Sequence, residues 1–313
     1  MARTAALVLS LLLLPAAAAA QHTLSRFESY FTDEDGTRVT VKVVSAVPGQ
    51  AALKVLYGPE ASNGYSDLGL RQPRGGQSAL ARQQAPAAVA SLDAMAKAMP
   101  FRVASQAERV LMGGGFSGYR SDVPVGLLVS GGRVLSPIDS SPPRVAPPPG
   151  CSVAESSSFR FSGLLCVRAD TGAWGIVRTG DYRPGMCREA VQAGPLLVEP
   201  GGEVGICARS GAPAGPAYAR LAACVGPNRA LHFALTSPTR LFALSDWLAR
   251  GPLKCDVALN LSGAEQAGWV DLPSPRFPLA KGEGGTHLPL ASALLIEASA
   301  GAARGLAPAT TSR

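Results

Sequence analysis

The chain has 313 residues, of which 47% are hydrophobic, with 35 glycines and 26 prolines, a composition typical of a turn-rich globular protein that contains β-structure rather than of a helical bundle. The formal net charge is +7, but the basic residues are scattered and accompany no nucleic-acid motif, so we predict no nucleic-acid partner. After the N-terminal segment, no apolar stretch reaches the roughly 18 residues that a transmembrane helix needs, and we expect no membrane span in the mature chain.

Residues 1–20 have the features of a secretory signal peptide. Arg3 gives a positive start, residues 5–14 form an apolar core, and the small residues 16–20 provide a cleavage site before Gln21. The apolar core is too short to span a bilayer, although a retained N-terminal anchor is the alternative. We therefore expect a secreted or periplasmic protein whose mature chain begins at Gln21.

The cysteines predict disulfide bonds, because an even number in an exported chain is typical of a disulfide framework. Six cysteines allow 15 connectivities, so the pairing stays open. No pair has the CxxC spacing and the chain has only 3 histidines, so we predict neither a metal site nor a cofactor. The cysteines lie in the C-terminal half, at Cys151, Cys166, Cys187, Cys207, Cys224 and Cys255.

The N-terminal part predicts a hairpin, a third strand and a helix. Residues 27–30 and 37–44 are expected to pair around an Asp35-Gly36 turn, and residues 52–57 to form the next strand. Residues 86–99 predict an amphipathic helix that packs on a sheet, with an apolar face formed by Val89, Leu92, Met95 and Ala96.

A glycine cluster follows an apolar run in the sequence VLMGGGF, residues 110–116. The glycines indicate either a tight loop packed on its neighbour or a backbone cradle for phosphate. The cluster has neither the lysine of a P-loop nor the spacing of a dinucleotide-binding loop, so a nucleotide site is not predicted. Residues 125–129 and 133–135 are expected to form a hairpin around Gly131-Gly132.

The rest of the chain predicts mainly strands. A proline-rich stretch at 140–150 is interpreted as a loop within one domain rather than a domain boundary. Residues 239–249 predict a second helix, and His232 is expected to be a packed or edge histidine rather than a catalytic one. The strands are expected at 159–168, 174–178, 193–206 with a Gly-Gly turn, 218–225, 230–236, 256–263 and 287–297.

These elements predict an α+β fold with mixed, largely antiparallel β-sheets and a few packed helices. We expect a single domain over residues 21–298 and a disordered tail over residues 299–313.

The order of these motifs resembles the phosphodiester glycosidase family. The resemblance covers roughly residues 37–297 and is carried by the glycine cluster with Phe116, VGLLVSGGRVLSP (125–137), QAGPLLVEPG (192–201), Ala219-Arg220 and ALNLSG (258–263). It implies an α+β domain whose loops converge on one cleft, and it implies cleavage of a sugar-1-phosphodiester.

Substrate-binding positions follow from the resemblance residue by residue. Arg220 matches a family arginine, and a guanidinium fork suits an anionic phosphodiester, although a solvent-exposed arginine is the alternative. Pro195 also matches the family's Gln-Ala-Gly-Pro element. The expected binding residues are Gly114, Gly115, Phe116, Gln192, Gly194, Arg220, Asn260, Ser262 and Gly263.

The chain also departs from the family pattern. Gly113 stands where the family has asparagine, Ser117 where it has a second phenylalanine, and Ser262 where it has the aspartate of Leu-Asp-Gly-Gly-Gly. Glycosyl cleavage ordinarily needs a carboxylate as acid, base or nucleophile, and a serine without a base cannot replace it. No catalytic residue is therefore assigned.

Three functions remain open. The favoured hypothesis is an exported, divergent or catalytically impaired phosphodiester-glycosidase-like protein that binds a sugar phosphate or an envelope glycan. The first alternative is an active hydrolase that cleaves sugar-1-phosphodiesters with another carboxylate, Glu265 or Glu189. The second is a structural or partner-binding periplasmic protein.

Overall fold

The computed structural model describes residues 24–57, 90–99, 107–116, 124–141, 161–207, 217–272, 281–286 and 289–299. The predicted signal peptide, most of the proline-rich stretch, Ser117 and the tail from residue 300 onward lie outside these residues, as do residues 86–89 of the first predicted helix.

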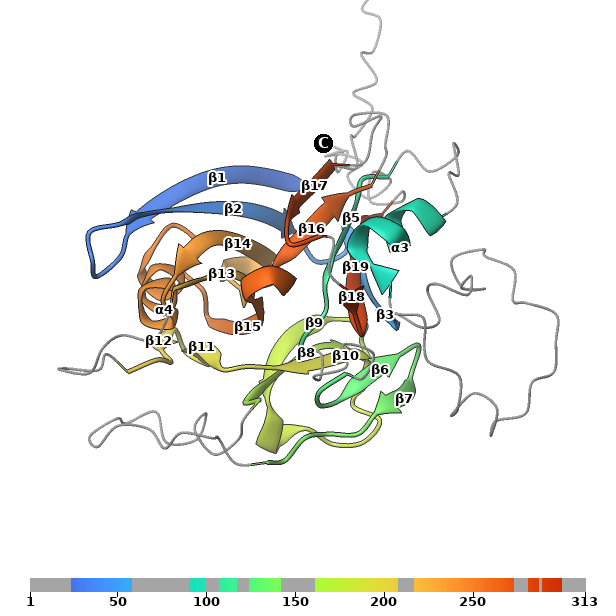
Figure 1. The fold of residues 1–313 in the computed structure, drawn as a ribbon. Coiled ribbons are helices and arrows are strands. Elements are labelled where there is room, and N and C mark those ends of the chain that lie inside the picture. The colour runs from blue at the N-terminus through green and yellow to red at the C-terminus, as the bar shows by residue number, and fades with distance from the viewer. Residues whose placement is uncertain are drawn as a thin grey trace, which may run out of the picture.

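Three antiparallel sheets make up most of the described chain (Figure 1). The seven-stranded sheet has the order β1 (Ser25–Thr32), β2 (Arg38–Ala46), β14 (Leu231–Thr239), β13 (Tyr218–Val225), β15 (Val257–Gly263), β11 (Leu196–Glu199) and β12 (Glu203–Val204). The β10 sheet has the order β7 (Arg133–Ser136), β6 (Leu128–Ser130), β10 (Cys187–Ala193), β8 (Gly163–Arg168) and β9 (Trp174–Arg178). The β5 sheet has the order β17 (Lys281–Gly284), β16 (Gly268–Asp271), β5 (Arg109–Gly113), β19 (Ser292–Ala298) and β3 (Ala51–Tyr57).

Short helical elements complete the described structure. The two α-helices among the described residues are α3 (Leu92–Ala98) and α4 (Leu241–Arg250), and the 3₁₀ turns are η3 (Thr179–Asp181), η4 (Pro227–Arg229) and η5 (Ala264–Gln266). A two-stranded ribbon pairs β4 (Ala90–Ser91) with β18 (Pro289–Leu290). None of the described helices is long and apolar enough to cross a membrane.

The predicted α+β class is wrong, because the described chain is essentially all-β. The first helix was expected over 86–99, but α3 spans only Leu92–Ala98 and follows strand β4. The Ser91 hydroxyl accepts a hydrogen bond from the Ala94 amide and caps the helix there, while the residue before it pairs with β18. The second predicted helix is confirmed as α4, and strands β10, β16 and β17 were not predicted.

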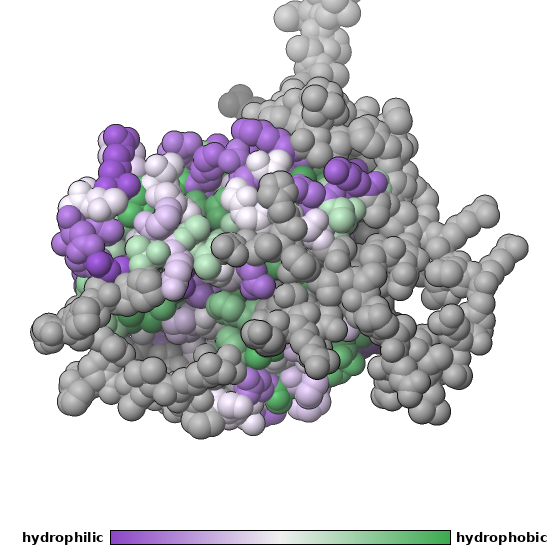
Figure 2. All heavy atoms as spheres, in the orientation of Figure 1, coloured by the Kyte–Doolittle hydropathy of each residue, from purple (hydrophilic) through white to green (hydrophobic). Residues whose placement is uncertain are grey.

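The predicted hairpins are confirmed, and local turn chemistry explains them. In the β1–β2 turn the Asp33 carboxylate accepts the amides of Asp35 and Thr37, and Gly36 takes a positive φ of 80°. In the β6–β7 turn both glycines, Gly131 and Gly132, have positive φ, as a two-residue hairpin loop requires. Figure 2 shows that the region of the β1–β2 hairpin is mostly hydrophilic, whereas apolar residues show over the strands beneath it.

The largest apolar cluster receives side chains from all three large sheets, including Val44, Leu165, Phe233, Leu259 and Leu294. The other face of the seven-stranded sheet is covered by α4, whose Leu244, Trp247 and Leu248 pack on Val41, Ala222 and Ala258. The predicted strand over residues 230–236 is confirmed as β14, and its side chains alternate between the two faces, since Phe233 belongs to the first cluster and Ala234 to the second. The single domain over 21–298 stays a prediction.

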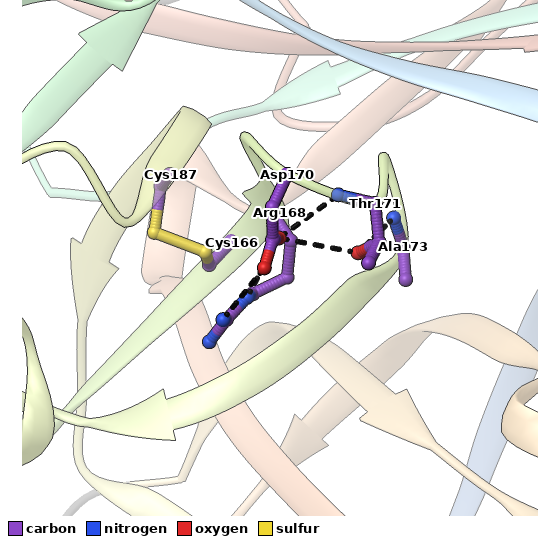
Figure 3. The surroundings of a disulfide bond; sticks show 6 residues. All are labelled: Cys166, Arg168, Asp170, Thr171, Ala173 and Cys187. Carbon is purple, nitrogen blue, oxygen red and sulfur yellow. Dashed lines mark hydrogen bonds and ion pairs between the residues drawn. A yellow bond between two sulfur atoms is a disulfide. The ribbon is translucent and has the colours of Figure 1, made fainter.

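Disulfide bonds staple two of the sheets. Cys166–Cys187 joins the neighbouring strands β8 and β10, beside the β8–β9 turn in which Asp170 accepts the Thr171 amide and pairs with Arg168 (Figure 3). Cys224–Cys255 ties β13 to the segment that follows α4, and Cys207 is also disulfide-bonded. These bonds are typical of proteins that fold in an oxidising compartment.

Glu189 of β10 connects the β10 sheet to the β5 sheet. Its two carboxylate oxygens accept the Val55 amide at 2.9 Å and the Gly131 amide at 3.1 Å. Burial raises the pKa of this carboxyl, although the two amides, Arg188 and Lys54 oppose the shift. The raised pKa means that the native state binds this proton more tightly than the unfolded chain does.

The free energy of unfolding should therefore depend on pH through the ionisation of Glu189. Because the native pKa is raised, this contribution is fully present below the ordinary glutamate pKa of about 4.3 and is lost as the pH rises through the native value. Urea unfolding measures this contribution across the same pH range. The free energy of unfolding of the wild type relative to Glu189→Gln should decrease as the pH rises and then become constant. An advantage that grows with pH would show that the two amides outweigh burial.

Candidate functional site

The glycine cluster leads from the β5 sheet to the place where the three sheets meet. A Cβ atom on Gly114 would lie 2.9 Å from the Ala293 backbone, and one on Gly115, which has a φ of +91°, would lie 2.6 Å from the Val191 side chain. Phe116 then packs against Phe161 in a tilted arrangement, with ring centroids 5.3 Å apart. These contacts support the interpretation of a tight loop packed on its neighbours, and the binding roles of Gly114, Gly115 and Phe116 stay predictions.

Gln192 is completely buried at the end of β10, and its amide is engaged inside the fold. Its oxygen accepts the amides of Leu127 at 2.9 Å and Asp139 at 2.8 Å. Its nitrogen donates to the carbonyls of Asp139 at 2.8 Å and Phe161 at 3.0 Å, and to the Thr179 hydroxyl at 3.3 Å. The side chain therefore holds three chain segments together, and its predicted contact with substrate stays a prediction.

Gly194 and Asn260 join the β10 sheet to the seven-stranded sheet. The Asn260 side-chain nitrogen donates to the Gly194 carbonyl at 3.0 Å, and the Gly194 amide donates to the Asn260 carbonyl at 3.0 Å. Asn260 is 1% exposed, yet its Oδ1 atom has no hydrogen-bond partner within the protein. A buried acceptor without a donor is costly, so this atom is a candidate contact for a bound hydroxyl or a water molecule.

Ser262 lies beside the second position at which the chain departs from the family pattern. A Cβ atom on Gly113 would lie 3.6 Å from the Ser262 hydroxyl oxygen and 3.0 Å from the Gln266 carbonyl oxygen. The Ser262 hydroxyl is buried and donates to that same carbonyl at 3.3 Å. The structure thus brings together positions 113 and 262, two of the positions at which the sequence departs from the pattern that it resembles.

Arg220 lies next to Leu221, the residue of β13 that pairs with Ser262, and its side chain is on the opposite face of the sheet from Ser262. Arg220 pairs with Gly263 and Leu221 pairs with Ser262, and successive residues of a strand alternate between faces. The space above Gly263 is filled by the guanidinium, because a Cβ atom there would lie 3.0 Å from Arg220 Nη1. A larger residue at 263 would require the guanidinium to shift.

The Arg220 guanidinium has no carboxylate partner in the part of the chain that the structure describes. Its Nε atom is buried and has no hydrogen-bond partner, and burial lowers the pKa of the group. The guanidinium carbon lies over the Tyr218 ring, 5.5 Å from its centroid. Because arginine stays charged in proteins, an unpaired and partly buried guanidinium favours an anionic ligand.

An open pocket of about 630 Å³ adjoins Arg220 at the end of these strands. Its wall consists of residues 217–219 at the start of β13, Pro238 of β14, and Gly263, Ala264 and Gln266 at the end of β15. Gln266 connects the two faces of the site, since it lines the pocket and its carbonyl oxygen accepts the Ser262 hydroxyl.

The predicted binding residues therefore fall into two neighbouring groups. Arg220, Ser262 and Gly263 lie at the pocket end of β13 and β15, with Gly113 next to them. Gly115, Phe116, Gln192 and Gly194 lie at the junction of the sheets, where their contacts are with other parts of the chain, and Asn260 joins the two groups.

The buried carboxylates of the described residues are all engaged away from Ser262. Glu108 and Asp271 both pair with Arg26, and Glu199 pairs with Arg178. Glu189 bridges two sheets and lies five residues before Gly194, roughly 16 Å along an extended strand. The Glu265 side chain lies outside the described residues, and those residues contain no group of three or more metal-ligating side chains.

Sequence reasoning missed Tyr218 as a site residue. The predicted strand over 218–225 already places Tyr218 and Arg220 on one face, two residues apart, which is the signal that would have found it. His232 has the packed position that was expected, with Nδ1 2.7 Å from the Ser45 hydroxyl, and burial lowers its pKa.

Comparison with solved structures shows a known fold. The chain aligns with the catalytic domain of zebrafish N-acetylglucosamine-1-phosphodiester alpha-N-acetylglucosaminidase, auto-inhibited by its pro-peptide, with a TM-score of 0.52 and 13% identity over 87% of this chain and 82% of that one. A hypothetical protein from Synechocystis aligns with a TM-score of 0.49 and 12% identity, over 88% of this chain and 62% of its own length.

No family model matches the sequence, and no curated protein matches it. The similarity to the zebrafish catalytic domain supports the family resemblance at the level of the fold only.

Proposed function

We propose that the protein is an exported member of this fold that binds a sugar phosphate or an anionic envelope glycan at the Arg220 pocket, with sugar-phosphodiester cleavage lost or strongly impaired. The observation that carries the proposal is the unpaired guanidinium of Arg220 beside an open pocket. A charge in this position is destabilising on its own, and a bound phosphate or carboxylate would compensate it with bidentate hydrogen bonds.

The loss of turnover is inferred from the missing acid. Ser262 and Gly113 occupy the positions of the family's aspartate and asparagine, and the buried carboxylates described here serve structural roles elsewhere. The zebrafish neighbour, an N-acetylglucosaminidase acting on a phosphodiester, supports a glycan-related ligand. The disulfides support a secreted or periplasmic location.

Binding should depend on Arg220. We expect Arg220→Ala to weaken binding of glucose 1-phosphate at least about tenfold, because a hydrogen bond to a charged group contributes roughly 1.5–3 kcal/mol. Arg220→Lys should recover only part of the affinity, since lysine keeps the charge and loses the fork. Calorimetric titration of the mature protein is the measurement.

Lys97→Ala is the matched control, because it removes one positive charge from an exposed site on α3. Equal affinities of Arg220→Ala and the wild type, or turnover of a chromogenic sugar-1-phosphodiester by the unmodified protein, would contradict the proposal.

A further inference from the structure

We propose that Tyr218 is the stacking platform for the sugar ring of the ligand, so that the pocket selects a hexopyranose phosphate rather than a free anion or a nucleotide. This inference rests on the proposed function of the Arg220 pocket and names a specificity-determining residue within it. Tyr218 is 42% exposed, although large apolar side chains are mostly buried in the described structure.

Tyr218 is the only aromatic residue among those that line the pocket in the described structure. Tyr218 lines the pocket together with neighbours that are small, Ala217, Ala219, Gly263 and Ala264. These residues have at most a methyl group and add little bulk beside the ring, while Pro238 and Gln266 complete the wall and the Arg220 guanidinium lies over the ring. An exposed aromatic face with small neighbours suits the apolar C–H face of a pyranose, which is a flat surface of similar size.

Arg220 and Tyr218 are arranged so that one ligand can contact both. They lie two residues apart on one strand, on the same face, with the guanidinium carbon 5.5 Å from the ring centroid. In a hexose 1-phosphate, the distance from the centre of the sugar ring to the phosphate is similar to this distance between the guanidinium and the aromatic ring. A hexose 1-phosphate can therefore place its ring over Tyr218 while its phosphate reaches the guanidinium.

The backbone around the pocket is also unusual. Ala264 has a φ of +54°, in the left-handed region that a non-glycine residue rarely adopts. Ala264, the next position after Gly263, contributes only a methyl group to the wall. Such strain is found preferentially where a binding site is shaped.

The test separates the ring from the anion by comparing glucose 1-phosphate, inorganic phosphate and adenosine 5′-monophosphate in calorimetric titrations. Tyr218→Ala is expected to lower the affinity for glucose 1-phosphate about tenfold and to leave the affinity for inorganic phosphate unchanged. Tyr218→Phe is expected to keep the wild-type affinity for both ligands. Tyr30→Ala is the control, because Tyr30 is an exposed tyrosine on the remote strand β1, and it should change nothing.

The outcomes distinguish this inference from the proposed function. If glucose 1-phosphate binds in an Arg220-dependent manner but Tyr218→Ala has no effect, or weakens both ligands equally, the stacking role is wrong and the anion site stands. If adenosine 5′-monophosphate binds more tightly than glucose 1-phosphate and depends on Tyr218, the ligand class is wrong. If neither ligand binds the wild type, both proposals fail.

Discussion

Replacing Gln192 by leucine is expected to destabilise the protein by roughly 4 kcal/mol, because several buried groups would lose their partners at once. The buried Leu127 amide donates to this side chain, the amide and the carbonyl of Asp139 both bond to it, and the Phe161 carbonyl accepts from it as well as from the Thr179 hydroxyl. Leucine and glutamine have similar volumes, so the loss of stability would come from the missing hydrogen bonds rather than from a cavity. Urea denaturation with an unchanged m-value is the measurement.

The surroundings of Gln192 make compensation difficult. Gly126 has a φ of +92°, and a Cβ atom there would lie 2.6 Å from the Gln192 side-chain oxygen, so the backbone approaches the amide too closely for water to replace it. Gln50→Leu, the same change at an exposed turn, should stay within about 0.5 kcal/mol of the wild type. A loss below about 1 kcal/mol in Gln192→Leu would show that the amide is not the connection between these segments.

Local sequence signals predicted the hairpins because their causes are local. Asp33 and Gly36 fold the β1–β2 turn with atoms only a few residues apart, and Gly131-Gly132 does the same for β6–β7. The fold class was wrong for the opposite reason. Ser91 caps α3 one residue before Leu92, and β4 pairs with a strand almost two hundred residues later, which no local periodicity contains.

Strand β16 shows why the β5 sheet was incompletely predicted. Its Trp269 pairs with Met112 on one side and Glu283 on the other, so its strand character comes from two distant partners. The same limit applies to the site. The spacing of Tyr218 and Arg220 on β13 was readable in the sequence, whereas the unpaired Nε of Arg220 and the meeting of Gly113 with Ser262 depend on how β5, β13 and β15 converge.

Converting Gly113→Asn and Ser262→Asp together is expected to raise turnover of a chromogenic sugar-1-phosphodiester at least about hundredfold above the unmodified protein, since a positioned acid or base contributes 10²–10⁴-fold. The two positions adjoin, because a Cβ atom on Gly113 would lie 3.6 Å from the Ser262 hydroxyl oxygen. Burial at 262 would raise the pKa of an introduced carboxyl and keep a proton on it near neutral pH, which suits a general acid. The Gln266 carbonyl must move slightly to admit the asparagine.

The control is Gly113→Asn with Ser262→Asn, which introduces the same volume without a carboxyl group and should remain inactive. Adding Arg220→Ala to the aspartate variant should remove the gained turnover if its substrate is held at the Arg220 pocket, since Gln266 lines that pocket and its carbonyl oxygen accepts the Ser262 hydroxyl. If the aspartate variant folds with an unchanged melting transition and binds glucose 1-phosphate but stays inactive, the missing carboxylate is not what prevents turnover. Turnover that persists without Arg220 would instead place the reacting phosphodiester outside the Arg220 pocket.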